Sequence, residues 1–332
     1  MNILVFTNSK LIKIAYENND DVFLDATFQT VNKLYKQLLI IRIYSERFNE
    51  FFKVCFILMT SKTKLLFKRS LNSFLSFLKE KNNINDNNII FNFTHSDMEL
   101  GLIKAVEEIM SKTKIKICYF HFSQALMRKI NNHFYEDLFQ NIPNAKTLIL
   151  SCKALSFIKP EFVNDVFYRL KEDVDDLNDP LLNDFYKYFE SEYIFTFDSE
   201  KWNYYLQKRH LTNNASEGYN SKLLRLSDYK KPTFWHNIEI IRNELEYFTN
   251  RYYDLIANNS PPSPDTIANI NRIYNLSINN SVNFNTLRLR YENNIEDIEE
   301  EIYIGMNNVD EDVFQIYIEF WYEKTKILSS YV

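Results

Sequence analysis

Glycine and cysteine are both scarce in this chain of 332 residues, which has 3 of each. The cysteines Cys55, Cys118 and Cys152 are too few for the disulfide framework of a small secreted protein, and the N-terminus has no secretory signal pattern. We therefore expect an intracellular, reducing compartment. No uninterrupted apolar run reaches the roughly 20 residues that cross a bilayer, so we expect a soluble protein without a membrane partner.

An excess of positive charge is also missing, because the net charge is -5. This excludes a basic field over the whole surface, so a polyanionic partner would need a local patch. Aromatic residues are abundant, with 28 Phe and 22 Tyr. An AT-rich coding sequence alone produces such a composition, and we do not interpret it as a binding signal. The length allows one large domain or two of ordinary size.

The most informative stretch is Val22 to Thr30, an apolar run that contains a single carboxylate, Asp25. A buried, ionised carboxylate loses several kcal/mol of hydration unless a cation compensates it, so Asp25 is a candidate site residue. Residues 22–25, 34–43 and 51–59 read as three consecutive strands of an antiparallel meander. The earlier runs 3–6 and 11–15 indicate either an edge hairpin or a strand followed by a helix.

The elements after residue 59 alternate between helix and strand. We expect helices at 63–80, 99–110 and 121–134, and strands at 89–93 and 115–120. Three strands followed by helix, strand, helix, strand and helix is a ribonuclease H-like order, with a mixed five-stranded sheet flanked by helices. In that arrangement Asp25 and Asp97 lie at the carboxyl ends of neighbouring strands and face the same crevice.

The rest of the chain predicts helices and no further strand. We expect helices at 145–155, 163–170, 181–193, 219–226, 235–255 and 312–328, with the clearest linker at 261–264. Glu217 stands in a polar stretch that leads into one of them. Three carboxylates from Asp25, Asp97 and Glu217 would suit two magnesium ions, roughly 3.5–4 Å apart, that promote phosphodiester transfer. Any single acid among 44 is usually a solvated surface charge.

Four blocks in one order resemble the transposase domain of Mutator-like elements (MULE). They are Asp25-Ala26-Thr27-Phe28 with residues 34–38, Thr94 to Glu99 with Lys104-Ala105, Cys118 to Leu126, and Arg209 with Thr212 to Glu217. The resemblance covers roughly residues 20–225. Ala26 replaces the family's usual Gly, and Tyr219-Asn220 stands where the family commonly has Trp-His.

The resemblance implies a DDE-type transposase that cleaves DNA and transfers a strand, with two Mg²⁺ or Mn²⁺ ions held by Asp25, Asp97 and Glu217. It implies a ribonuclease H-like core at 1–135, a helical insertion at 136–211, the remainder of the core at 212–258 and a helical, partly acidic C-terminal extension at 265–332. Transposon ends and target DNA would be the partners, the protein would work as a multimer, and its location would be nuclear.

Cys118 and His121 form a Cys-x-x-His pair that supplies at most half of a zinc site. They are either a buried thiol and a hydrogen-bonded His at a turn, or auxiliary residues of the active crevice. Glu99 is either an auxiliary ligand or, as we favour, a charge at a helix N-terminus. Candidates for DNA contact, each equally readable as a solvated helix face, are Arg128, Lys129, Lys208, Arg209, Asn213, Asn214, Lys222, Arg225 and the pair Lys230-Lys231.

A second function remains open beside catalysis. The sequence lacks the Cys/His array of the zinc-finger module that related transposases usually carry before the catalytic domain. The chain is then a truncated copy, a protein that uses a separate DNA-binding partner, or a domesticated derivative that binds nucleic acid or protein without catalytic turnover.

Overall fold

The computed structural model describes residues 2–18, 20–82, 91–131, 145–205, 214–228 and 231–258. The expected linker at 261–264 and the expected helix at 312–328 lie outside these residues. The chain divides into two compact units. The first comprises Met1–His121 and Thr212–Thr266, and the second comprises Phe122–Leu211 and Ile267–Val332.

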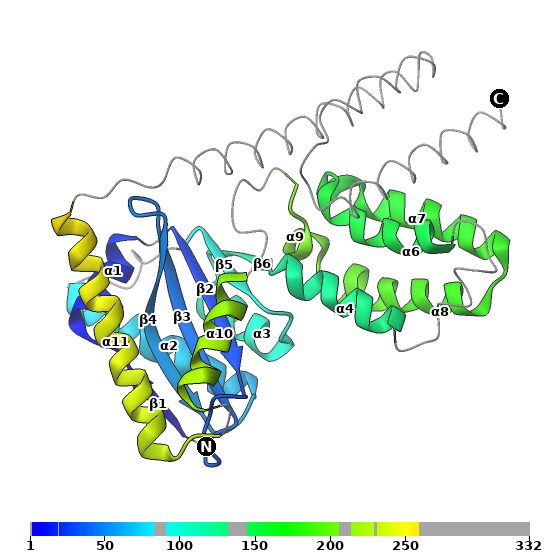
Figure 1. The fold of residues 1–332 in the computed structure, drawn as a ribbon. Helices are drawn as coiled ribbons and strands as arrows, with labels where there is room; N and C mark the ends of the chain where they lie inside the picture. The colour runs from blue at the N-terminus through cyan, green and yellow to red at the C-terminus, as the bar shows by residue number, and fades with distance from the viewer. Residues whose placement is uncertain are drawn as a thin grey trace. The chain divides into compact units, whose positions relative to one another are not determined.

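The first unit is built on a mixed sheet with the strand order β1-β4-β3-β2-β5-β6 (Figure 1). The strands are β1 Ile3–Phe6, β2 Asp21–Thr27, β3 Gln37–Ser45, β4 Glu50–Met59, β5 Phe93–Ser96 and β6 Lys114–Ile117. β2, β3 and β4 form an antiparallel meander, and β5 and β6 run parallel to β2. The expected ribonuclease H-like α/β fold is confirmed.

The strand count is corrected from five to six by β1. This strand pairs antiparallel with β4 at the edge of the sheet, with Ile3 opposite Met59. α1 Ser9–Glu17 follows it, and the Asn8 side chain caps this helix by accepting a hydrogen bond from the Leu11 N–H. The N-terminal segment is therefore a strand followed by a helix, and the hairpin alternative was wrong.

Two strand boundaries also differ from those expected. β5 includes Thr94, His95 and Ser96 because they pair with Val22, Phe23 and Leu24 of β2, although the apolar run suggested a strand ending at residue 93. β6 ends at Ile117, and Tyr119 already begins α4 Tyr119–Asn131. The polar end of β5 is stabilised by its pairing with β2, which an apolar pattern does not show.

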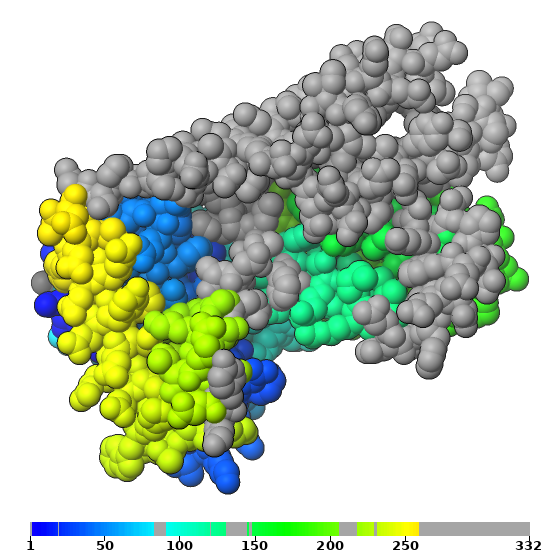
Figure 2. Space-filling model, in the orientation of Figure 1, coloured from blue at the N-terminus to red at the C-terminus, as the bar shows by residue number. Residues whose placement is uncertain are grey.

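Helices cover both faces of this sheet. α2 Lys64–Asn82 and α3 Leu100–Ile109 lie behind it in Figure 1, and α10 Asn214–Leu226 and α11 Phe234–Ala257 lie in front. α2 buries Leu66, Phe67, Leu71, Phe74 and Leu78, which recur at helical spacing. In Figure 2 the atoms of α10 and α11 lie against one another on the front of the unit.

The described part of the second unit is helical, as the sequence predicts. It contains the end of α4, α6 Ala145–Ala154, η1 Leu155–Phe157, α7 Pro160–Leu177, α8 Pro180–Phe189, the π-helix η2 Glu190–Thr196 and α9 Ser199–Trp202. Its centre is Trp202, which is fully buried and stacks on Phe122 with ring centroids 5.2 Å apart. The indole N–H donates to the carbonyls of Tyr193 and Phe197 at 2.8 and 3.1 Å.

Candidate active site

Asp25 and Asp97 lie side by side at the carboxyl ends of two parallel strands. The register pairs Phe23 with His95 and Leu24 with Ser96, so Asp97 is the next partner in line for Asp25. Side chains alternate along a strand, and both aspartates therefore lie on the face that carries Phe23 and His95. Asp25 is 2% exposed and the Asp97 side chain 19%. The two acids that the sequence singled out on strand ends do come together.

The charges of these two carboxylates oppose each other. Burial, followed by the negative charge of Asp97, raises the pKa of Asp25 to about 6. The charges of Arg42 and His121 and a hydrogen bond from Asn220 act in the other direction without restoring the usual value. Two buried carboxylates whose mutual repulsion is only partly compensated form a set of oxygen donors that suits a hard divalent cation such as Mg²⁺.

His121 lies against the second aspartate. Its Nδ1 is 3.0 Å from Asp97 Oδ1, and it extends from the first turn of α4. Burial opposes the imidazolium charge, but the Asp97 carboxylate and the Cys118 thiol more than offset burial and raise the pKa of His121 to about 10. His121 is thus a cation paired with Asp97 at neutral pH.

Cys118 occupies the turn between β6 and α4. It is buried, and its backbone N–H donates to the Ser96 carbonyl at 2.9 Å, which ties the turn to the end of β5. Within the described residues no group of three His, Cys, Asp or Glu side chains is arranged to hold a metal ion. Cys118 is thus a buried thiol at a turn, and this turn places His121 against Asp97. An auxiliary role of the pair in catalysis stays a prediction.

Arg42 is a buried cation that our sequence reasoning missed. It lies on β3 opposite Phe23, is 1% exposed, and its guanidinium carbon is 5.8 Å from the Phe23 ring centre and 5.4 Å from that of Phe51. Burial lowers the pKa of Arg42, while the charges of Asp25 and Asp97 support its protonated form. A single Arg inside the apolar run 38–43 is the same kind of signal that identified Asp25.

α10 brings a second residue onto Asp25. The Asn220 side chain donates from Nδ2 to Asp25 Oδ2 at 3.0 Å. This helix begins at Asn214, five residues before the expected start, so Glu217 lies inside it and not before it.

α10 and α11 also contact charged groups near Arg42. Lys53 of β4 is 8% exposed, and its Nζ lies 4.6 Å from the ring centres of both Tyr219 and Phe248. Lys222 of α10 donates to Glu244 of α11 at 2.8 Å, and Glu244 is 5% exposed. Burial, and next the charge of Arg42, lowers the pKa of Lys53 to about 7.

Most of the described candidates for DNA contact lie on the helices α4 and α10. Lys222 is the ion-pair partner of Glu244, while Arg225 is exposed in the last turn of α10. Lys129 pairs with Asp184 at 2.9 Å, and Arg128 contacts Gln124. Glu99 occupies the N-cap position of α3 without a side-chain capping bond, and it accepts a hydrogen bond from Gln37 at 2.9 Å. Lys208, Arg209, Asn213 and the Asn214 side chain lie outside the described positions, as does Lys230.

The strand order and the paired aspartates define a ribonuclease H-like α/β domain. Residues 22–125 match the family model of the MULE transposase domain, and this segment is therefore a Mutator-like element transposase domain. The match includes Asp25, Asp97, Cys118 and His121 and covers less than half of the chain. No curated protein matches the chain. No helix among the described residues is long and apolar enough to cross a membrane.

Proposed function

We propose that this chain is the catalytic part of a DDE-type transposase that cleaves DNA strands and transfers the freed 3′ end to target DNA. The observation that carries the proposal is the adjacency of Asp25 and Asp97 at parallel strand ends inside a MULE transposase domain. Transposon ends and target DNA are the substrates, a multimer is the working form, and the nucleus is the expected location.

Asp25, Asp97 and Glu217 would hold two Mg²⁺ or Mn²⁺ ions. Such ions, when bound, activate a water or hydroxyl and stabilise the leaving oxygen of a phosphodiester. The chain's own residues prepare this site. Asn220 fixes one oxygen of Asp25 through its hydrogen bond, and His121 fixes one oxygen of Asp97. Each aspartate is thereby oriented, which leaves its second oxygen to act as a ligand.

The helical segment 136–211 would be an insertion between the second and third acids, as in the domain plan that the sequence resemblance implies. In this plan the chain leaves the core after the Cys-x-x-His turn and returns with α10, which carries Glu217 and Asn220. The hydrogen bond from Asn220 to Asp25 supports the return of α10 to the first acid.

The positive charges around the two acids favour a second function. His121 and Asp97 form an ion pair, and Arg42 supplies another positive charge near Asp25, so the acids have cationic neighbours within the protein itself. A transposase-derived module that binds DNA without turnover would have such a neutralised site.

The test compares metal-dependent nicking of a supercoiled plasmid by the full chain and its variants. We expect Asp25→Asn and Asp97→Asn each to lower nicking in Mg²⁺ or Mn²⁺ at least about a hundredfold, because each removes a metal ligand. Asp165→Asn, an exposed acid on α7, serves as the matched control and should nick like wild type. Equal nicking by all forms contradicts the catalytic proposal. DNA binding without metal uptake in calorimetry supports the second function.

A further inference from the structure

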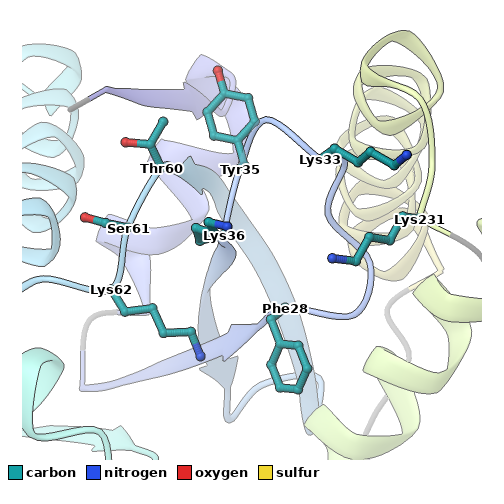
Figure 3. A pocket seen from close by; sticks show the side chains of 8 residues that line it. All are labelled: Phe28, Lys33, Tyr35, Lys36, Thr60, Ser61, Lys62 and Lys231. Carbon is teal, nitrogen blue, oxygen red and sulfur yellow. The ribbon is translucent and has the colours of Figure 1, made fainter.

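A cationic cavity of about 450 Å³ opens at the carboxyl end of β2, the end of the sheet that also carries the aspartates (Figure 3). Phe28 follows β2, residues 60–62 follow β4, and residues 33–36 precede β3, so the walls come from three neighbouring strand ends. Lys231, just before α11, completes the lining. The volume lies within the roughly 300–1,000 Å³ of ordinary ligand pockets.

Four lysines line this cavity, namely Lys33, Lys36, Lys62 and Lys231, and all four are exposed. In the part of the chain that the structure describes, none of them forms an ion pair with a carboxylate. The whole chain is acidic, so this cluster is a local departure from its charge. Four uncompensated ammonium groups around one hollow attract an anion with several charges.

An aromatic ring stands among these charges. Phe28 is 55% exposed, and Lys62 Nζ lies 5.0 Å from the centre of its ring. In Figure 3 the side chains of Lys62 and Lys231 extend from opposite sides toward the space beside Phe28. An exposed ring between ammonium groups is the arrangement that stacks a nucleic-acid base while its phosphates meet the cations.

The loop that carries Phe28 and Lys33 is anchored to α11 beneath the cavity. Asn32 donates to the Asn237 side chain at 3.2 Å, and Asn237 donates to the Thr30 carbonyl at 3.1 Å. Both asparagines are 2% exposed. Tyr35 stacks on Phe234 of the same helix, with ring centroids 6.4 Å apart. The cavity is therefore held in shape before any ligand binds, which lowers the ordering cost of binding.

The cavity is close to the first acid along the chain. Phe28 is three residues beyond Asp25, so their Cα atoms are at most about 11 Å apart. A strand whose base stacks on Phe28 can therefore place a nearby phosphate at the aspartates. Duplex DNA offers its stacked bases only at their edges, whereas an unpaired nucleotide presents a free face to the ring.

We propose that this cavity binds one unpaired nucleotide of a DNA strand, with its base on Phe28 and its flanking phosphates on Lys62 and Lys231. The inference rests on the proposed function, because it supplies the strand that the aspartates would cut. The site distinguishes single-stranded from fully paired DNA and holds the strand next to the cleaved bond.

Binding is measured without metal, so that catalysis plays no part. The affinity for a labelled oligo(dT) is measured by fluorescence anisotropy in EDTA. Four proteins are compared: the full chain, Lys62→Gln/Lys231→Gln, Phe28→Leu and the control Lys112→Gln/Lys114→Gln. The control lysines are exposed near the start of β6, at the opposite end of the strands. We expect the cavity double variant and Phe28→Leu each to weaken binding roughly tenfold, and the control to bind like wild type.

Two further readouts separate the roles of charge and stacking. The slope of log K against log salt should fall by about 1.4 in Lys62→Gln/Lys231→Gln, since each phosphate contact in a single strand contributes about 0.7. With an abasic oligonucleotide, Phe28→Leu should bind like wild type, because no base remains to stack. Equal loss in the cavity and control double variants, or equal loss with both oligonucleotides in Phe28→Leu, overturns the proposal.

The same set of proteins in the nicking assay separates this inference from the proposed function. Cavity-dependent binding without any nicking upholds the cavity and contradicts the catalytic function. Metal-dependent nicking with unchanged oligonucleotide binding in the cavity variants contradicts the cavity and leaves the catalytic function standing.

Discussion

His121 Nδ1 lies 3.0 Å from Asp97 Oδ1, and Asn220 Nδ2 lies 3.0 Å from Asp25 Oδ2 on the neighbouring strand. Each aspartate of the pair thus has one partner from a different helix, α4 for Asp97 and α10 for Asp25. Asn220 stands at a position where the chain departs from the pattern of the family it resembles. Its contact with Asp25 places a polar group on the first acid.

Replacing His121 removes the cation paired with Asp97. We expect His121→Gln to lower the free energy of unfolding by about 1–3 kcal/mol at pH 7 in EDTA, because the two aspartates lose a compensating charge. Urea unfolding followed by far-UV circular dichroism measures the change. The exposed Lys112 provides the control Lys112→Gln, which should stay within about 0.5 kcal/mol of wild type. Equal effects of the two substitutions contradict the ion-pair role.

The repulsion between the aspartates predicts an unusual stability effect. Since burial and Asp97 raise the pKa of Asp25, its ionised form is unfavourable in the folded state at neutral pH. We therefore expect Asp25→Asn to leave stability in EDTA equal to or above wild type at pH 7. In a double-mutant cycle, Asp97→Asn should stabilise less, or destabilise more, when Asp25 is already Asn. Additive free energies contradict the coupling.

The buried Lys53 should make the stability of the folded protein depend on pH. Burial, with the charge of Arg42, lowers its folded-state pKa from 10.5 to about 7, and Lys222 acts in the same direction while Glu244 and Glu50 oppose it. Between about pH 7 and 10.5 the unfolded chain binds more protons at this lysine, so its contribution favours folding increasingly as pH rises. Stability of wild type relative to Lys53→Met should rise by about 2–4 kcal/mol over this interval.

The control for Lys53 is Lys112→Met, an exposed lysine whose stability curve should run parallel to wild type from pH 7 to 10. Urea titrations at four pH values give the differences. Parallel curves for wild type and Lys53→Met show that the Lys53 amine is equally protonated in the folded and unfolded states.

The buried Trp202 should contribute strongly to the stability of the second unit. Its indole N–H donates hydrogen bonds to the Tyr193 and Phe197 carbonyls, and its ring is fully buried. Trp202→Phe leaves both carbonyls without this donor and removes ring volume, so we expect a loss of about 2–4 kcal/mol. Thermal unfolding of the variant, compared with Tyr168→Phe on the surface of α7, measures it. A melting temperature equal to that of wild type contradicts this role.

The fold was largely predictable because its pattern is local. Apolar runs defined β2, β3 and β4, and helical spacing defined α2, α3 and α11. The errors occurred where pairing, and not polarity, forms the strand. Thr94 to Ser96 belong to β5 because β2 supplies their hydrogen bonds. β1 joins the sheet only through β4, which lies about fifty residues further along the chain.

The site was only partly predictable. Asp25 and Asp97 followed from their positions at strand ends, and His121 from a motif. Arg42 and Asn220 were missed, since a buried cation and a polar residue on α10 acquire meaning only from the carboxylate they face. The lysine cavity was missed as well, although Lys231 was among the basic residues considered.

The sequence by itself determined which side chains had to be explained, because a charge within an apolar strand is costly wherever that strand lies. It also determined the helices and most strands, whose spacing is a local property of the chain. Only the tertiary structure decided which of these charges meet. Pairing of β2 with β5 brings Asp97 to Asp25, and packing of α10 on the sheet brings Asn220 to the same carboxylate. Such contacts depend on the register of strands far apart in the chain, which no local pattern specifies.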